Sequence, residues 1–591
     1  MRKIYDILKG LLQLKATEFV IFTFFVLFNA SFLLEYSYIH SLDGAQHIYN
    51  SMVIAELATG NNFMSQFFSI NPVIVGYWTG PFLLSLFNYF FAANVAMKLL
   101  IFVCLAGVAY SFRYLIYSIR KETNYLILLI IPFTMQTYLL MGYYTFSVAW
   151  IFFFIGLGYY IRHRDNLRGW SLFWMGLLFL LLYLSHLVVF AFALVCLFIY
   201  IIFHFVESLI KHNKKEAQKQ VFNTLKLIGV SVPSLVLTVI YAAHVFKING
   251  EMANTDLPTG TLLVNLVTLR NLIAFDLIFE SPIGRIIFFS LVTVLVYLLV
   301  LYVVKILQRK KYPEISYTGN KLVWFIIASI ILAIYFFMPN TFGTGAISVR
   351  ILVWFYFMFA IWFCLQKIHW PVGLLLLFVL YFTSVERSKI ISRNLEFLNS
   401  DVKEIVSVGK LMEPNSIYYS LNYSEYWSHI HFGCYAGADV AAAYVLNPQC
   451  EGHFPVIWNK KDLPCILLGN KSKYDLNRHW VTSDSLHQIQ IIDYVVVWGH
   501  SMFKRDKSSH RYFIEKYYSL IGLSEKGNAA IYKFKFKEIL NESFKKMRNT
   551  PSWYAQLQEK AKLMGIPVEN VMVYDAFYLL DLYYHDSMKK E

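Results

Sequence analysis

The chain has 591 residues, of which 58% are hydrophobic and only 15% are charged, and its formal net charge is +15. Ordinary soluble domains carry about 25% charged residues. This composition therefore excludes a disordered chain, a nucleic-acid-binding arm and a purely soluble enzyme, and it predicts a polytopic α-helical membrane protein. In such a protein the excess of Lys and Arg belongs to cytoplasmic loops, so no nucleic-acid partner is expected.

The first apolar run follows a basic N-terminal segment. Residues 1–15 are basic, and residues 19–34 are apolar. A cleaved signal peptide is the rival interpretation, but the run is long for a signal peptide and no small-residue cleavage site follows it. We expect a retained first span whose N-terminus lies in the cytoplasm.

Apolar stretches long enough to cross about 30 Å of hydrocarbon recur along the first two-thirds of the chain. They predict about eleven membrane spans. The expected spans are Phe19–Tyr36, Asn94–Tyr117, Tyr125–Met141, Thr145–Ile161, Trp170–Ser185, Leu187–Phe205, Phe222–Val245, Arg285–Leu307, Leu322–Phe337, Ile351–Leu365 and Pro371–Ser384.

A further apolar segment, Val73–Phe91, is assigned by the charges of the neighbouring loops. If this segment crossed the membrane, the basic loops at Arg120–Lys121 and Arg162–Arg164 would fall outside. If it lies on the outer surface, every basic loop falls inside, as the positive-inside rule requires. We therefore expect an interfacial helix within a long outer loop, residues 37–93, and an exported region after about residue 386.

The composition changes near Arg387, where runs rich in Val and Ile begin to alternate with helical stretches. This pattern predicts an extracytoplasmic α/β or α+β domain. Its expected strands are Ser416–Leu421, Ala441–Leu446, Ile489–Trp498 and Ala529–Phe536. The predicted organisation is a transmembrane domain over residues 1–386, the exported domain over 387–540, and a helical tail over 541–591 with two short helices that separate at 565–567.

The strongest candidate for chemistry opens the first outer loop. Ser41 suits the N-cap of a helix, which places Asp43 in the first turn, where the helix dipole keeps a carboxylate ionised. Asp43, His47 and Asn50 are spaced i, i+4 and i+7, so they share one helical face. An ionised carboxylate that faces outward beside a span is a candidate general base. The alternative is a capped helix whose polar face only meets water.

Other residues near the outer ends of spans are candidates for binding an anionic substrate. Lys98 and Arg350 could hold a lipid phosphate or diphosphate, although such residues also snorkel to the headgroups. His186 lies at a turn between two short spans, where a packing role is the alternative. Tyr77 and Trp78 are aromatic residues of the first outer loop that could line a site.

The second long outer loop, residues 246–284, contains a predicted helix over Leu262–Phe279. Its acidic pair, Asp276 and Glu280, could bind a metal, but a solvated helix face is the favoured interpretation. The sequence has no P-loop, HExxH or CxxC pattern, so no cofactor is indicated and a divalent cation is left open. Three cysteines of the polar C-terminal part could form one disulfide: Cys434, Cys450 and Cys465.

The layout of residues 15–386 resembles the membrane-embedded GT-C glycosyltransferases, a superfamily that includes aminoarabinose and protein O-mannosyl transferases. In that family the first span leads to an outer loop that opens with an acidic residue, here within Leu42–His47 (LDGAQH). A Pro-led surface helix follows, here from Asn71–Trp78, and a basic residue opens the second span, here Lys98, where the family often has Arg. Residues 142–147 and 184–186 are also similar to bacterial members.

The resemblance implies that a sugar, a hexose or pentose, moves with inversion from a polyprenyl-phosphate carrier to a glycan, lipid or protein acceptor. It places this reaction at the outer face of a bacterial plasma (inner) membrane, with membrane lipid as a further partner. It makes Asp43 the catalytic base. The expected substrate-binding residues are His47, Asn50, Tyr77, Trp78, Lys98, His186 and Arg350.

Two features qualify what the resemblance implies. Many members of the family carry two adjacent acids after the first span, whereas Gly44 follows Asp43 here, so the role of the second acid is unfilled. The tail around Trp553 and Asp575 resembles the C-terminal tails of Bacteroidota membrane transferases, which concerns lineage. A polysaccharide polymerase, a transporter and a non-catalytic membrane scaffold with this fold are the alternative functions.

Overall fold

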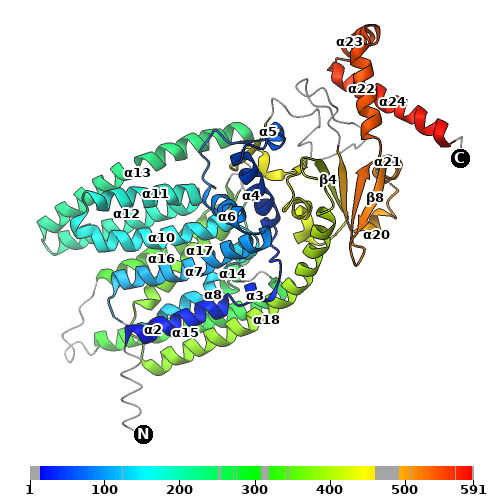
Figure 1. Cartoon of the computed structure of the whole chain (residues 1–591). Coiled ribbons are helices and arrows are strands. Elements are labelled where there is room, and N and C mark those ends of the chain that lie inside the picture. The colour runs from blue at the N-terminus through cyan, green and yellow to red at the C-terminus, as the bar shows by residue number, and fades with distance from the viewer. Residues whose placement is uncertain are drawn as a thin grey trace. The chain divides into compact units, whose positions relative to one another are not determined.

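The computed structural model (Figure 1) divides into two compact units. The helical unit comprises residues 1–39, 73–80 and 98–396, and the mixed unit comprises residues 40–72, 81–97 and 397–591. The structure describes residues 14–122, 124–249, 255–270, 272–273, 276–307, 319–342, 345–459, 492–507, 509–565 and 567–588.

The helical unit is built from apolar helices that pack around a large apolar core. Its α-helices are α2 (Lys15–Asn29), α3 (Phe32–Glu35), α7 (Ala93–Ile119), α8 (Ile131–Thr134), α9 (Thr137–Leu140), α10 (Tyr144–His163), α11 (Trp170–Ser185), α12 (Leu187–Ile210), α13 (Lys214–Asn249), α14 (Thr259–Val267), α15 (Leu277–Leu307), α16 (Gly319–Phe337), α17 (Ser348–Cys364) and α18 (Trp370–Gly409). Two 3₁₀ helices, η1 (Tyr125–Ile130) and η2 (Arg164–Asn166), and a short hairpin of β2 (Thr341–Phe342) and β3 (Gly345–Ala346) complete it.

Close packing of these helices depends on small and aromatic residues. Helices α10 to α13 lie side by side (Figure 1). A Cβ atom on Gly158 of α10 would clash with the ring of Tyr114, so glycine lets α7 and α10 approach closely. The rings of Phe192 and Trp354 stack with their centroids 4.0 Å apart and join α12 to α17.

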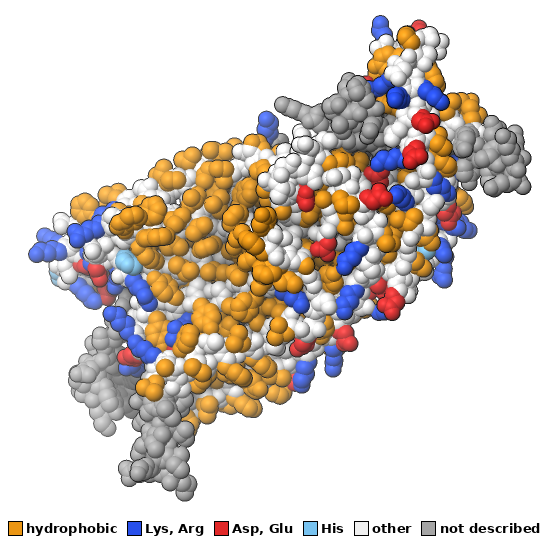
Figure 2. Space-filling view, in the orientation of Figure 1, with side chains coloured by type: hydrophobic (Ala, Val, Ile, Leu, Met, Phe, Trp, Pro, Cys, Tyr) orange, Lys and Arg blue, Asp and Glu red, His pale blue; other side chains and the backbone are white. Residues whose placement is uncertain are grey.

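Five helices of the described residues are long and apolar enough to cross a membrane. They are Ala93–Ile119, Tyr144–Asn166, Leu187–Ile210, Lys214–Lys247 and Leu277–Val304, and further apolar helices of 10–17 residues accompany them. Hydrophobic side chains also cover most of the surface that the helices of this unit show in Figure 2. These observations indicate a membrane protein, as the composition predicts. The expected number of about eleven spans stays a prediction.

Several expected helices are interrupted. The predicted first span is broken at Ala30 and Ser31, between α2 and α3. The predicted span over residues 125–141 is a series of short pieces, η1, α8 and α9, and Pro132 lies in the first turn of α8. The expected surface helix over Val73–Phe91 begins only at Thr79, as α6 (Thr79–Phe90). Proline has no backbone N–H and restricts the residue before it, so Pro132 favours the boundary between η1 and α8.

The predicted helix over Leu262–Phe279 is wrong in its middle, and so is the interpretation of its acidic pair. Helix α14 ends at Val267, and α15 begins at Leu277. Asp276 caps α15, since its Oδ1 accepts hydrogen bonds from the N–H groups of the second and third residues of the helix. Glu280 is fully buried instead of solvated, and its Oε1 accepts a 2.7 Å hydrogen bond from Arg387.

The mixed unit contains a five-stranded sheet in the order β5-β4-β7-β9-β8. Strands β4 and β7 are parallel, as are β4 and β5, whereas β9 is antiparallel to β7 and β8. The strands are β4 (Ile417–Asn422), β5 (Ala443–Tyr444), β7 (Tyr494–Trp498), β8 (Tyr518–Leu523) and β9 (Ala529–Phe534). Four of these match the strands expected from the Val- and Ile-rich runs, while residues 489–491 lie outside the described part of the chain.

The first outer loop belongs to this mixed unit. It supplies α4 (Gly44–Ala58), α5 (Met64–Phe67), most of α6, and β1 (Phe68–Ile70), which pairs antiparallel with β6 (Val456–Trp458). The hydroxyl of Tyr49 on α4 donates to the carbonyl of Ala442 at 2.8 Å and accepts from the N–H of Tyr444 at 2.7 Å. The loop and the C-terminal sheet are therefore one packed structure.

The remaining helices of the mixed unit are short or lie in the tail. They are η3 (Trp427–His431), α19 (Gly433–Ala436), η4 (Pro448–Cys450), α20 (His500–Phe503), α21 (Ser509–Tyr517), α22 (Lys537–Asn549), α23 (Pro551–Met564) and α24 (Val568–Met588). The predicted break in the tail is present, because α23 ends at Met564 and Gly565, whose φ of +65° suits glycine, caps it. The sequence predicts a helical tail with two helices, and the structure has a third, α22, before them.

Candidate functional site

Asp43 lies at the N-cap position of α4, one residue before the helix begins, rather than inside its first turn. Its side chain makes no capping hydrogen bond, so its carboxylate is not engaged by the N–H groups of the helix. Burial raises the pKa of Asp43 to about 6. A carboxyl group with a pKa close to neutral pH has the property that general base catalysis favours.

His431, at the end of η3, is the nearest titratable partner of Asp43 that the structure gives. Its Nε2 lies 3.7 Å from the Asp43 Oδ1, too far for a good hydrogen bond. Burial lowers the pKa of His431 to about 4. Because the histidine loses its proton below the pH at which the carboxyl group does, the two are not charged together to a significant degree at any pH. Above pH 6 the Asp43 carboxylate faces a neutral imidazole.

A second histidine, His40, fixes the segment that carries His431. Its Nε2 lies 3.1 Å from the carbonyl oxygen of Ser428, and its Nδ1 lies 3.1 Å from the hydroxyl of Tyr435. A carbonyl can only accept, so Nε2 carries the proton and Nδ1 accepts from the tyrosine. Burial lowers the pKa of His40 to about 3, so it stays neutral and keeps this arrangement. The close packing also needs Gly433, where a Cβ atom would clash with Ser420.

Sequence reasoning missed His40, His431 and Tyr435. The only local signal was the pair of histidines two residues apart in Trp427–Phe432, a segment rich in aromatic residues. Nothing local in that pattern relates it to Asp43, which is almost 400 residues away in the chain.

The other two residues of the predicted face of α4 are buried, so this face does not simply meet water. The ring of His47 packs edge-on against Phe454, with a centroid separation of 6.3 Å. The Asn50 amide donates to Gln449 Oε1 at 2.8 Å and accepts from Asn447 Nδ2 at 2.7 Å. Asn50 thereby holds α4 against the segment that follows β5, and a role in substrate binding stays a prediction for both residues.

A second group of candidates gathers within the helical unit. The ring of His186 lies edge-on to Tyr77, 5.3 Å between centroids, and to Phe146, 5.1 Å. Burial lowers the pKa of His186, and the positive charge of Arg350 lowers it further. Burial also raises the pKa of Tyr77, which Arg350 opposes. The two pKa shifts place Arg350 within electrostatic reach of both side chains.

Two buried nitrogen atoms of this group have no hydrogen-bond partner among the described residues. Among the described residues, the Arg350 Nε and the His186 Nδ1 are buried without a hydrogen-bond partner. Arg350 donates from another nitrogen to the carbonyl of Ala346 at 2.9 Å, which orients its guanidinium group. Buried polar atoms of this kind are costly unless a ligand or water satisfies them, so the group can receive an anion.

Trp78 belongs beside this group, whereas the structure gives no contact of Lys98 with it among the described residues. The Trp78 backbone N–H donates to the Leu184 carbonyl at 2.7 Å, and the Thr79 hydroxyl donates to Ser185 at 2.9 Å, so both hold residues 77–79 against the turn of His186. Lys98 is half-buried near the start of α7. Within the described part of the chain, no hydrogen bond or ring contact joins Lys98 to His186 or Arg350.

Metal and disulfide chemistry have few candidates here. In the residues that the structure describes, no group of three or more His, Cys, Asp or Glu side chains could hold a metal ion. Cys434 and Cys450 are buried free thiols, and Cys465 lies outside the described residues. The expected disulfide between two of these three cysteines is therefore not formed by Cys434 with Cys450.

Comparisons with known proteins give similarity in structure only. No protein-family model matches the chain, and no curated protein sequence matches it. Among solved structures, the chain is similar to ArnT from Cupriavidus metallidurans in the apo state, with 9% sequence identity, a TM-score of 0.43, and coverage of 88% of this chain and 98% of that one. It is also similar to ArnT from the same organism bound to undecaprenyl phosphate, with 8% identity, a TM-score of 0.41 and the same coverage.

Proposed function

We propose that this protein is a membrane glycosyltransferase that moves a sugar from a polyprenyl-phosphate carrier to an acceptor at the outer face of the membrane. The observation that carries the proposal is the state of Asp43, a half-buried carboxyl group with a pKa of about 6 that has no capping hydrogen bond and faces a neutral histidine. Structural carboxylates are usually paired or hydrogen-bonded, whereas a general base must keep a free lone pair and a pKa near the working pH.

The group around His186 supports the second requirement, which is a place for the carrier phosphate. Arg350 and His186 each present a buried nitrogen without a partner among the described residues. Arginine binds phosphate oxygens with strong, charge-assisted hydrogen bonds. We assign Arg350 and His186 to the phosphate of the carrier, with Lys98 as a further cation and with Tyr77 and Trp78 beside the sugar. His47 and Asn50 are assigned to the acceptor side.

The proposed reaction is a single displacement. Asp43 removes the proton from an acceptor hydroxyl, and the oxygen attacks the anomeric carbon of the sugar. The bond from that carbon to the phosphate oxygen breaks, and the lipid phosphate leaves with the electron pair. The configuration of the sugar inverts, and the protein contributes mainly by positioning the reactants and stabilising charge.

The remaining parts of the proposal come from the sequence. The transmembrane domain over residues 1–386 binds the carrier, and the exported domain over 387–540 binds the acceptor, which is a glycan, a lipid or a protein. The sugar is a hexose or a pentose, and the protein lies in the plasma membrane of a bacterium with its N-terminus in the cytoplasm.

The pH dependence of transfer tests the proposed base. We expect kcat/KM to rise with pH through an apparent pKa of about 6 and then level off, because only ionised Asp43 can take a proton. Transfer should be about tenfold slower at pH 5 than at pH 7. The measurement uses membranes that contain the protein and a radiolabelled polyprenyl-phosphate sugar, with initial rates taken across this range. No transfer at any pH would contradict the proposed function, and a flat profile would contradict the role of Asp43.

Replacing Arg350 by Gln tests the proposed phosphate group. We expect kcat/KM for the polyprenyl-phosphate sugar to fall by roughly 10- to 100-fold, the usual loss for one hydrogen bond to a charged group. Arg393→Gln is the matched control, because Arg393 is an exposed arginine of the same unit, and it should change kcat/KM less than twofold. Equal effects of the two variants, with equal amounts of folded protein, would remove Arg350 from the site.

A further inference from the structure

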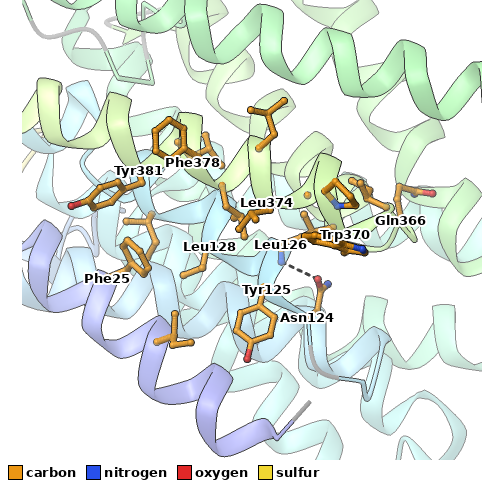
Figure 3. Close-up of a pocket in the computed structure, with 18 of the residues that line it drawn as sticks. Phe25, Asn124, Tyr125, Leu126, Leu128, Gln366, Trp370, Leu374, Phe378 and Tyr381 are labelled. Carbon is orange, nitrogen blue, oxygen red and sulfur yellow. Dashed lines mark hydrogen bonds between the residues drawn. The ribbon is translucent and has the colours of Figure 1, made fainter. Parts of the chain in front are cut away.

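A large apolar groove lies in the helical unit, away from the residues assigned above. Its volume is about 1050 Å³. Its walls come from α2, from η1 and α8, and from residues 366–384, which include the first part of α18. Figure 3 shows Phe25, Phe378 and Tyr381 together toward one end, and Asn124, Gln366 and Trp370 together toward the other. The groove is therefore elongated, with an aromatic end and a more polar end.

The polar end of the groove is basic. Arg120 and Lys367 both line the groove, and Lys367 directly follows Gln366 in the chain. Arg120 donates to Glu122 at 2.8 Å, and the pKa of Glu122 is lowered first by this hydrogen bond and further by Lys367 and Lys321. Arg120, Lys367 and Lys321 thus all act on one exposed carboxylate, so the cations that act on Glu122 outnumber it.

This basic end is at the opposite end of the helices from the proposed phosphate group. Lys98 lies near the start of α7, and Arg120 lies just beyond its end. The 22 residues that separate them correspond to about 33 Å at the rise of an α-helix. Arg350 lies near the start of α17, and Lys367 lies just beyond its end. By the same measure these two residues are about 25 Å apart. A phosphate held by Arg350 cannot also reach Lys367, so the groove would bind a different molecule.

The rest of the groove fits a hydrocarbon chain. The stretch of α18 from Trp370 to Ser384 is about 21 Å long, more than the roughly 15 Å of one leaflet of the hydrocarbon core. Leu374, Leu375 and Phe378, which line the groove, are exposed. A long apolar surface that opens outward and ends at cations matches a lipid with an anionic headgroup.

We propose that this groove binds one anionic phospholipid, with an acyl chain along α18 and the phosphate headgroup at Arg120 and Lys367. The site is independent of the proposed sugar transfer. The chemistry of the headgroup is a phosphodiester, and its source is the membrane, since the apolar groove would be left empty by a free phosphate ester.

Lipid retention tests the headgroup end. The protein is reconstituted in vesicles of equal amounts of phosphatidylcholine and phosphatidylglycerol with the same acyl chains, extracted in detergent, and its retained lipid is measured by mass spectrometry. We expect the protein to retain at least about fivefold more phosphatidylglycerol than phosphatidylcholine. Lys367→Gln should lower this ratio by about fivefold. The matched control is Lys215→Gln, which removes an exposed lysine outside the groove and should leave the ratio unchanged. Equal retention of the two lipids, or displacement of phosphatidylglycerol by glycerol 3-phosphate, would overturn the proposal.

Filling the groove tests the chain end. Gly373 lines the groove, and a Cβ atom there would meet no atom within 4 Å, so Gly373→Leu places a side chain in the open space without a clash. Gly229 of α13 has equally open surroundings and does not line the groove, so Gly229→Leu is the matched control. We expect Gly373→Leu to reduce retained phosphatidylglycerol by at least half and Gly229→Leu to leave it unchanged. Equal retention by both variants would contradict an acyl chain in the groove.

Discussion

Asp43→Asn is expected to lower kcat for sugar transfer by roughly 10²- to 10⁴-fold, the range that a lost general base produces. Asparagine has the shape of aspartate but cannot take a proton from the acceptor. Asp43 makes no capping hydrogen bond to α4, and its nearest titratable neighbour, His431, is 3.7 Å away. The substitution therefore removes little that holds the mixed unit together, and the loss should fall on kcat much more than on folding.

The measurement compares initial rates of transfer in membranes that contain equal amounts of protein. Glu425→Gln is the matched control, because it makes the same change of carboxylate to amide at an exposed residue of the segment that precedes His431. We expect this control to retain the activity of the unmodified protein. Normal activity of Asp43→Asn would contradict the proposed base, and equal losses in both variants would point to a general effect of charge.

The residual activity of Asp43→Asn should also lose its pH dependence near pH 6. The rise with pH in the unmodified protein is assigned to ionisation of Asp43, and His431 is already neutral in this range because its pKa is about 4. A profile that keeps its midpoint near pH 6 in the variant would assign the titration to another group.

The sequence predicted those features that depend on neighbouring residues. Strands β4, β7 and β9 follow from runs of Val, Ile and Tyr, and the break near Gly565 follows from a residue that accepts a positive φ. The position of Asp43 beside a helix was also predicted, although the helix begins two residues later than a cap at Ser41 would require. Local pattern is sufficient for these features because each depends on a few adjacent residues.

The partners of the candidate residues could not be predicted in this way. His431 meets Asp43, and Tyr444 meets Tyr49, through contacts between segments almost 400 residues apart. An acidic residue on an apparent helix face also predicts solvent exposure, whereas Glu280 is buried against Arg387. Such pairings depend on how helices pack, which periodicity does not determine.

Arg387→Gln is expected to destabilise the protein by about 3–5 kcal/mol, the cost of leaving one partner of a buried ion pair uncompensated. The Arg387 side chain is only 4% exposed, and that of Glu280 is 0% exposed. The guanidinium group also donates to the carbonyls of Pro132 at 3.2 Å and Met135 at 2.6 Å, beside the short helix α8. The variant therefore leaves a buried carboxylate and two carbonyl groups without their donor.

An exposed ion pair on the same helix separates burial from charge. Lys389 and Glu386 are also 2.7 Å apart, but the Lys389 side chain is 60% exposed, and exposed pairs contribute about 0–1 kcal/mol. Thermal unfolding in detergent should therefore show a large fall in Tm for Arg387→Gln and almost none for Lys389→Gln. Adding Glu280→Gln to Arg387→Gln should restore part of the Tm, because it removes the unpaired charge, but the two carbonyls stay without a donor. A Tm of Arg387→Gln equal to that of Lys389→Gln would show that the buried pair contributes no more to stability than the exposed one.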